Sequence, residues 1–137
     1  MEKEHWRDER ILFSQMSLAE VFYIYNNHML KMRKQDFKFK KHSMDRVKQK
    51  HITKREVIQA AMNGKPIEFH IVDNSPRVLF RCQRPNQTWD ICAVVDILTG
   101  EVITAFLNHT NDKHSTLHEE IYNTELDVIS VMKGLIE

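Results

Sequence analysis

Histidine and arginine side chains in the middle of the chain are the first candidates for chemistry. His42 stands just before a short helix predicted at residues 43–50, and Arg46 follows one helical turn later. An imidazole, whose usual pKa is ~6.5, can donate or accept a proton near neutral pH. His42 is therefore a candidate acid or base at the start of this helix, with an ordinary polar surface residue as the alternative.

A second group of candidates lies on predicted strands. Side chains alternate along a strand, so Arg77 and Arg81 share one face of a strand at 77–83. In a strand at 101–107, Ile103, Ala105 and Leu107 are expected on the core face. The opposite face and the residue beyond it would carry Val102, Thr104, Phe106 and Asn108. An open sheet face with guanidinium, hydroxyl, amide and aromatic groups can hold a phosphate and stack an unpaired base. The alternative is an ordinary solvated sheet face.

Metal and cofactor motifs are weak or missing from the sequence. His109, His114 and His118 have a loose metal-ligand spacing, but no cysteine pair accompanies them, so no metal site is predicted. There is no glycine-rich phosphate loop, no H-E-x-x-H and no G-x-S-x-G. His51 and His70 are interpreted as structural. Any catalysis is therefore expected to use His, Arg, Lys and hydroxyl groups without a cofactor.

Positive charge is concentrated in one stretch. Residues 31–55 contain eleven Lys and Arg against two Asp, a net charge of +9, although the whole chain carries only +1. Residues 112–137 contain six carboxylates against two Lys, a net charge of −4. A basic stretch of this kind is typical of a nucleic-acid partner. A solvated helix surface, or neutralisation by an acidic segment or partner, is the alternative.

Three S/T-x-x-E sequences predict helix starts, at Ser17, Thr53 and Thr116. The expected helices cover residues 5–16, 18–33, 43–50, 54–62 and 117–133. The expected strands cover residues 67–72, 77–83, 88–97 and 101–107, and short turn sequences between them predict an antiparallel meander.

The predicted fold class is α+β, with N-terminal helices, two short middle helices, a four-stranded antiparallel meander and a C-terminal helix. Its expected parts are an N-terminal helical extension at 1–35, an α+β core at 36–111 and an acidic C-terminal helix at 112–137. With 137 residues, 42% of them hydrophobic, the chain is large enough for one packed domain. No apolar stretch is long enough to span a membrane, so a cytoplasmic location is expected.

Residues 39–107, about half of the chain, resemble a family of small bacterial and phage domains of unknown function. That family is grouped by fold with the barnase, EndoU, colicin and RelE-like toxin nucleases. The matching pieces, in order, are Phe39-x-x-His42-x-x-x-Arg46-Val47, Ile52-Thr53-x-x-Glu56-Val57, Asn63-Gly64-x-x-Ile67-Glu68, Arg77-Val78-Leu79, Val94-Val95 and Val102-Ile103-Thr104. The chain departs from the family pattern at Lys50, where arginine is usual.

The resemblance implies a metal-independent ribonuclease, toxin-like, acting in a toxin–antitoxin or phage–host setting with an antitoxin as protein partner. It implies that His42 is the acid or base and that Arg46 positions it or contacts phosphate. Arg77 or Arg81 would neutralise the developing charge, and Thr104 would donate a hydrogen bond. The expected substrate-binding residues are Lys40, Lys41, Arg77, Phe106, Asn108 and His109.

Two other functions fit the sequence. One is a non-catalytic phage or mobile-element regulator on the same fold, acting through a protein partner or as a homodimer through the N-terminal helices, where Tyr25, Met29 and Met32 are available. The other is simple RNA or DNA binding by the basic stretch, with a steep salt dependence.

Overall fold

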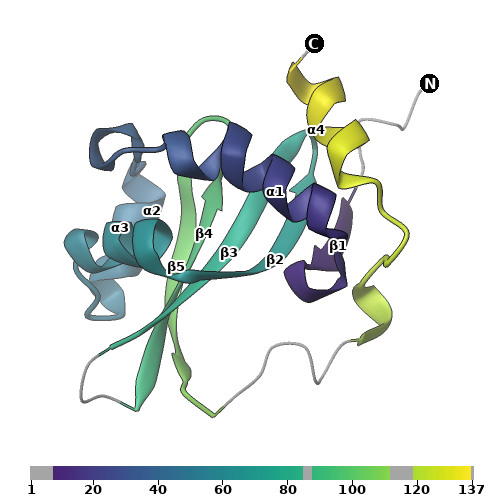
Figure 1. Ribbon diagram of the computed structural model, residues 1–137. Helices are drawn as coiled ribbons and strands as arrows, with labels where there is room; N and C mark the ends of the chain where they lie inside the picture. Colours follow the sequence, from purple (N-terminus) through teal and green to yellow (C-terminus); the bar gives the residue numbers. More distant parts are fainter. Residues whose placement is uncertain (1–7, 85–87, 112–118, 137) are drawn as a thin grey trace.

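The computed structural model describes residues 8–84, 88–111 and 119–136 of the chain. Within these ranges, one antiparallel sheet of five strands is packed against helices (Figure 1). The strands, in sheet order, are β1 (Asp8–Leu12), β2 (Lys65–Val72), β3 (Ser75–Gln83), β4 (Trp89–Asp96) and β5 (Val102–His109). The helices are α1 (Leu18–Asn27), α2 (Lys41–Gln49), α3 (Lys54–Asn63) and α4 (Val128–Ile136). The α+β class is confirmed. No helix in these residues is long and apolar enough to cross a membrane.

The fifth strand corrects the sequence prediction. A helix was expected at residues 5–16, whereas Asp8–Leu12 form β1 and residues Phe13–Gln15 form a short 3-10 helix. β1 pairs antiparallel with β2, with Ile11 opposite Phe69, and both side chains are buried in the core. A five-residue strand has too few alternating positions to be recognised from its own sequence. Its hydrogen-bond partner, β2, lies far along the chain, so no neighbouring segment indicates the pairing either.

The N-terminal caps of α1 and α3 form as predicted. Ser17 Oγ accepts a hydrogen bond from Glu20 N at 3.2 Å, and Glu20 Oε1 accepts one from Ser17 N at 3.0 Å. Thr53 and Glu56 repeat this reciprocal pair at 3.1 and 2.9 Å. Such caps satisfy backbone donors that the first helical turn leaves unpaired.

The other helix limits differ from the prediction. α1 ends at Asn27, six residues early, and a 3-10 helix at Met29–Lys31 follows. The last helix begins at Val128 rather than 117 and continues through Gly134. Its start is fixed by Asp127 Oδ1, which accepts from Ser130 N at 3.1 Å, and by Glu20 Oε2, which accepts from Val128 N at 2.9 Å. Thr116, the predicted cap, lies outside the described residues.

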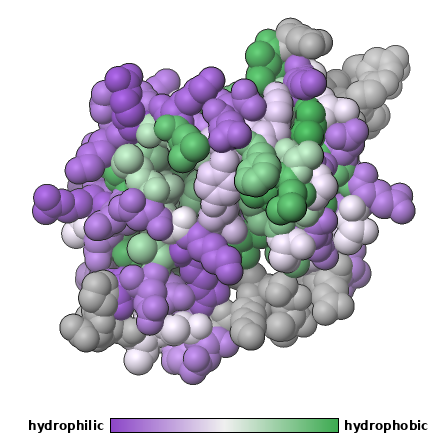
Figure 2. All heavy atoms as spheres, in the orientation of Figure 1, coloured by the Kyte–Doolittle hydropathy of each residue, from purple (hydrophilic) through white to green (hydrophobic). Residues whose placement is uncertain are grey.

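One face of the sheet forms the core with the helices. Phe69, Val78 and Phe80 from the strands are buried with Ile24 from α1 and Val57 from α3. Figure 1 shows α1, α2 and α3 over this same face of the sheet. On the helix side of the molecule, hydrophilic side chains dominate over α2 and α3, whereas apolar side chains gather over α1 and α4 (Figure 2).

A bulge changes the predicted alternation in β5. The pairing register between β4 and β5 shifts between Val94 and Val95, so that Val94 pairs with Thr104 and Val95 pairs with Val102. Val102 consequently lies in the core, and Ile103 turns toward the opposite face. The predicted sheet faces of the Val102 and Ile103 side chains were therefore wrong, because the extra residue of a bulge reverses the side-chain alternation.

Candidate functional site

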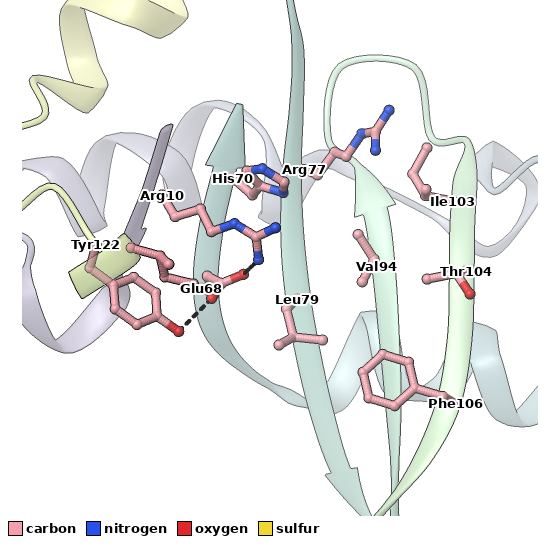
Figure 3. Close-up of a pocket in the computed structure, with 11 residues that line it drawn as sticks. Arg10, Glu68, His70, Arg77, Leu79, Val94, Ile103, Thr104, Phe106 and Tyr122 are labelled. Carbon is pink, nitrogen blue, oxygen red and sulfur yellow. Dashed lines mark hydrogen bonds and ion pairs between the residues drawn. The ribbon is translucent and has the colours of Figure 1, made fainter. Parts of the chain in front are cut away.

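A hollow of about 330 Å³ lies on the sheet face opposite the helix-packed core (Figure 3). Its polar lining comes from four strands and from the segment that follows the 3-10 helix Glu119–Ile121. These polar residues are Arg10, Glu68, His70, Arg77, Thr104 and Tyr122. Leu79 and Val94 form the floor between them, and the ring of Phe106 closes one end.

Strand alternation and register bring these side chains together. In β2, Glu68 and His70 alternate with the buried Phe69 and Ile71. The β2–β3 register then places His70 opposite Arg77, and the β4–β5 register places Val94 opposite Thr104. Because these pairs lie on one face, His70, Arg77 and Thr104 line the same hollow.

Glu68 is the buried acid of the hollow, with only 8% of its surface exposed. Its Oε1 accepts a hydrogen bond from Arg10 Nη1 at 3.3 Å, and its Oε2 accepts one from the Tyr122 hydroxyl at 2.7 Å. Burial of Tyr122 and its hydrogen bond to Glu68 raise the pKa of the phenol far above its usual value. Tyr122 therefore keeps its proton at neutral pH, and Glu68 positions both neighbours rather than acting as a free base.

His70 is the titratable group best suited to accept a proton. Asp8 Oδ1 accepts a hydrogen bond from His70 Nε2 at 2.6 Å. Burial lowers the pKa of the imidazole, and the nearby Arg10 charge acts in the same direction, while the hydrogen bond to Asp8 opposes them. With its pKa lowered, the ring is neutral at pH 7, which is the form that a general base requires.

Arg77 is held by a short chain of polar groups. Its Nε donates to Ser75 Oγ at 3.1 Å, and Ser75 Oγ donates to Asp96 Oδ2 at 2.7 Å. Asp96 is buried and is itself fixed by the backbone N–H groups of Leu98 and Thr99, at 2.8 and 3.0 Å. Among the described residues, Nη1 and Nη2 of Arg77 have no hydrogen-bond or ion-pair partner. Both nitrogens therefore remain for a ligand.

Three predicted site residues, Arg77, Thr104 and Phe106, line the hollow. Arg81 lies outside its lining, because Nε donates to Asp90 Oδ2 at 2.7 Å and Nη2 donates to the His109 carbonyl oxygen at 2.6 Å. The His109 ring is exposed and contacts Trp89 edge to face, with the centroids 5.4 Å apart. Asn108 pairs with Asp90 beyond the hollow.

His42 does not lie in the sheet-face hollow. His42 is exposed in the first turn of α2, and α2 packs through Val47 on the opposite, core-forming face of the sheet. Ser43 Oγ fixes this helix by donating to Val102 O at 2.6 Å. None of the described side chains of α2 lines the hollow. The side chain of Arg46 is not among the described parts of the chain.

The basic segment does reach the edge of the hollow through one side chain. Lys50 Nζ lies 5.7 Å from the centroid of the Phe106 ring and donates to Ala105 O at 3.4 Å. The predicted substrate-binding residues Lys40 and Lys41 lie earlier in the same segment. Lys41 is exposed, and Lys40 Nζ forms an ion pair with Glu101 Oε1 at 3.4 Å. Lys50 therefore places one positive charge of the basic segment beside the aromatic end of the hollow.

Sequence reasoning missed five residues of this site, namely Asp8, Arg10, Glu68, His70 and Tyr122. Alternation within 67–72 could have placed Glu68 and His70 on the open face, since Phe69 and Ile71 are the apolar partners. Arg10 and Tyr122 have no such local signal, because both reach the site from segments far from β2 in the sequence.

The described residues contain no group of three or more His, Cys, Asp or Glu that could hold a metal ion. His114 and His118, considered as ligands from the sequence, lie outside those residues. Compared with family models, curated proteins and solved structures, the chain matches none of them.

Proposed function

We propose that this protein binds single-stranded RNA in the sheet-face hollow and cleaves it there without a metal ion. The observation that carries the proposal is the pairing of His70 with Arg77 across β2 and β3, with Thr104 and Phe106 in the same hollow. A neutral imidazole suits proton transfer, and a guanidinium group whose Nη1 and Nη2 have no partner among the described residues suits binding of a phosphate.

In the proposed reaction, His70 takes the proton of a ribose 2′-hydroxyl while the 2′-oxygen attacks the adjacent phosphorus. The bond to the 5′-oxygen breaks, the leaving oxygen takes a proton from solvent, and a 2′,3′-cyclic phosphate is formed. Arg77 and the Thr104 hydroxyl stabilise the extra negative charge on the phosphate oxygens. Phe106 stacks on a neighbouring base, and Lys50 attracts the strand that continues past it.

This assignment differs from the one implied by the resemblance, in which His42 is the acid or base. Both assignments share the reaction class and the contributions of Arg77 and Thr104. The toxin-like role and an antitoxin partner follow from the resemblance alone and stay predictions. His42 lies in α2 on the helix side of the sheet, away from the hollow.

The direct test is incubation of the purified chain with total RNA in the presence of a metal chelator. We expect cleavage by the natural protein and by His42→Ala, and its loss in His70→Asn and Arg77→Ala. His42→Ala is the matched control, because His42 is exposed and outside the hollow. Equal cleavage by His70→Asn and the natural protein would remove His70 from the mechanism.

A second candidate function is non-catalytic binding through a partner or a dimer. The exposed apolar side chains of α1, which include Leu18 and Phe22, favour it. In that case the natural chain would leave RNA intact in the same assay, and Arg77→Ala would change nothing.

A further inference from the structure

The outward side of α1 carries two large exposed apolar side chains and no exposed charge. Leu18 and Phe22 are 74% and 59% exposed and lie one helical turn apart, with the half-buried Val21 and Tyr25 beside them. These four residues are called the α1 patch. Apolar side chains gather over α1 in the space-filling view (Figure 2). Large apolar side chains exposed together on a protein surface mark an interaction site.

The one charged residue of α1 is occupied in capping. Glu20 Oε1 accepts from Ser17 N at 3.0 Å, and Glu20 Oε2 accepts from Val128 N at 2.9 Å. Its carboxylate is therefore committed to the starts of α1 and α4. The remaining exposed residues of the helix are Ala19, Asn26 and Asn27, which are small or uncharged. A partner that covers the α1 patch need not desolvate a free charge.

The two ends of the α1 patch carry opposite charge. At the N-terminal end, the Glu20–Val128 hydrogen bond holds the start of α4 beside the first turn of α1, and the exposed Glu125 and Asp127 come just before Val128 in the chain. At the C-terminal end, α1 continues into a segment with the exposed Lys31 and Lys34. A surface with an acidic and a basic end is complementary to itself when it is turned around.

We propose that the α1 patch is the interface of a symmetric homodimer in which α1 of one copy packs antiparallel on α1 of the other. A two-fold axis puts the same residues on both sides of an interface. Antiparallel packing sets the acidic end of each copy against the basic end of its partner, whereas parallel packing would bring like charges together. This proposal does not depend on the proposed RNA cleavage.

The dimer leaves the sheet-face hollow accessible in both copies. α1 packs on the core-forming side of the sheet through Ile24, and the hollow opens on the opposite side. Figure 1 shows α1 crossing the helix-covered face. Two chains joined through α1 would therefore present their hollows on the two outer sides of the assembly.

The test is the molecular mass of the full chain in solution, by sedimentation equilibrium from low to high micromolar concentration. We expect the mass of two chains for the natural protein and of one chain for Phe22→Glu. Met62→Glu is the matched control, since Met62 is an exposed apolar residue (42%) in α3 rather than α1, and this variant should stay dimeric. Circular dichroism checks that each variant is folded.

A charge exchange tests the antiparallel arrangement. Lys31→Glu and Glu125→Lys should each weaken the dimer by about fivefold in dissociation constant, as for an exposed ion pair. Together they should restore the natural affinity, because the exchanged charges meet across the two-fold axis. A one-chain mass for the natural protein at every concentration, or a dimer that persists in Phe22→Glu, would overturn the proposed interface. A double variant no tighter than either single variant would overturn the antiparallel packing.

Discussion

His70 and Arg77 are direct cross-strand neighbours on β2 and β3, and each is fixed from its own side by a carboxylate. Asp8 binds the imidazole directly at 2.6 Å, whereas Asp96 reaches the guanidinium group through Ser75. The imidazole has a lowered pKa, and the guanidinium keeps two nitrogens for a ligand. Both side chains line the same hollow, in which the proposed ribonuclease would bind its phosphate.

Ser75 is predicted to matter through the position of Arg77. Ser75→Ala removes the acceptor of Arg77 Nε and its link to Asp96, so kcat/KM for RNA cleavage should fall by about tenfold. Ser75→Thr keeps a hydroxyl in a strand and should restore most of the activity. Ser14→Ala, which changes an exposed serine elsewhere, is the control and should have no effect. Unchanged cleavage in Ser75→Ala would show that Arg77 needs no such support.

The Tyr122 hydroxyl should contribute measurably to stability. Tyr122→Phe removes the 2.7 Å hydrogen bond to the buried Glu68 carboxylate. We expect the free energy of unfolding in urea to fall by about 1–2 kcal/mol, since the bond is charge-assisted. Tyr25→Phe is the matched control, because the Tyr25 hydroxyl has no hydrogen-bond partner within the described ranges, and its cost should be near zero. Equal losses in the two variants would contradict a specific contribution of Tyr122.

Much of the fold could be predicted from local signals. Capping boxes at Ser17 and Thr53 located two helix starts, because their hydrogen bonds join residues three apart. The strand segments from β2 to β5 followed from apolar alternation and turn composition. β1 could not be found this way, since its identity depends on pairing with β2. The start of α4 depends on Glu20, which lies 108 residues earlier in the chain.

The site was only partly predictable for the same reason. Alternation in β3 placed Arg77 toward the open face, and alternation in β5 did so for Thr104 and Phe106. Sequence patterns could not place His42, because helical periodicity does not say which face of the sheet a helix covers. Arg81 has the correct parity, but a local partner, Asp90, occupies its guanidinium group.

His28 should make stability depend on pH. Its Nε2 is buried without a hydrogen-bond partner among the described residues, and burial, followed by the charge of Lys31, lowers its pKa. Since the folded-state pKa lies below the unfolded value of ~6.5, the unfolded chain binds more protons in the window between them. The free energy of unfolding should therefore fall as the pH falls below about 6.5.

His28→Phe should reduce this pH dependence and raise stability at pH 7 by about 1 kcal/mol, because a buried polar atom without a partner is removed. Urea unfolding at pH 5 and pH 7 measures both effects. The dependence that remains in the variant is attributed mainly to His70, whose pKa is also lowered, with the lowered pKa values of Glu56 and Asp127 adding to it at the acidic end. A His28→Phe protein that loses as much stability on acidification as the natural chain would contradict this account.

Gly64 and Gly134 should respond in opposite ways to the same substitution. Gly64 follows α3, and a Cβ there would run into the Ala60 carbonyl oxygen and lie 2.9 Å from the Arg81 carbonyl oxygen, both of which are backbone atoms. Gly64→Ala should therefore destabilise the chain by about 2 kcal/mol through overpacking. Gly134 lies inside α4, and a Cβ added there would meet no described atom within 4 Å outside the backbone of its own helix. Gly134→Ala should therefore stabilise the chain by up to about 1 kcal/mol through helix propensity.

Thermal and urea unfolding of the two glycine variants give the comparison. A neutral Gly64→Ala would mean that α3 can move away from β3 at little cost. A destabilising Gly134→Ala would contradict the open surroundings of that position in α4, because helix propensity alone favours alanine over glycine.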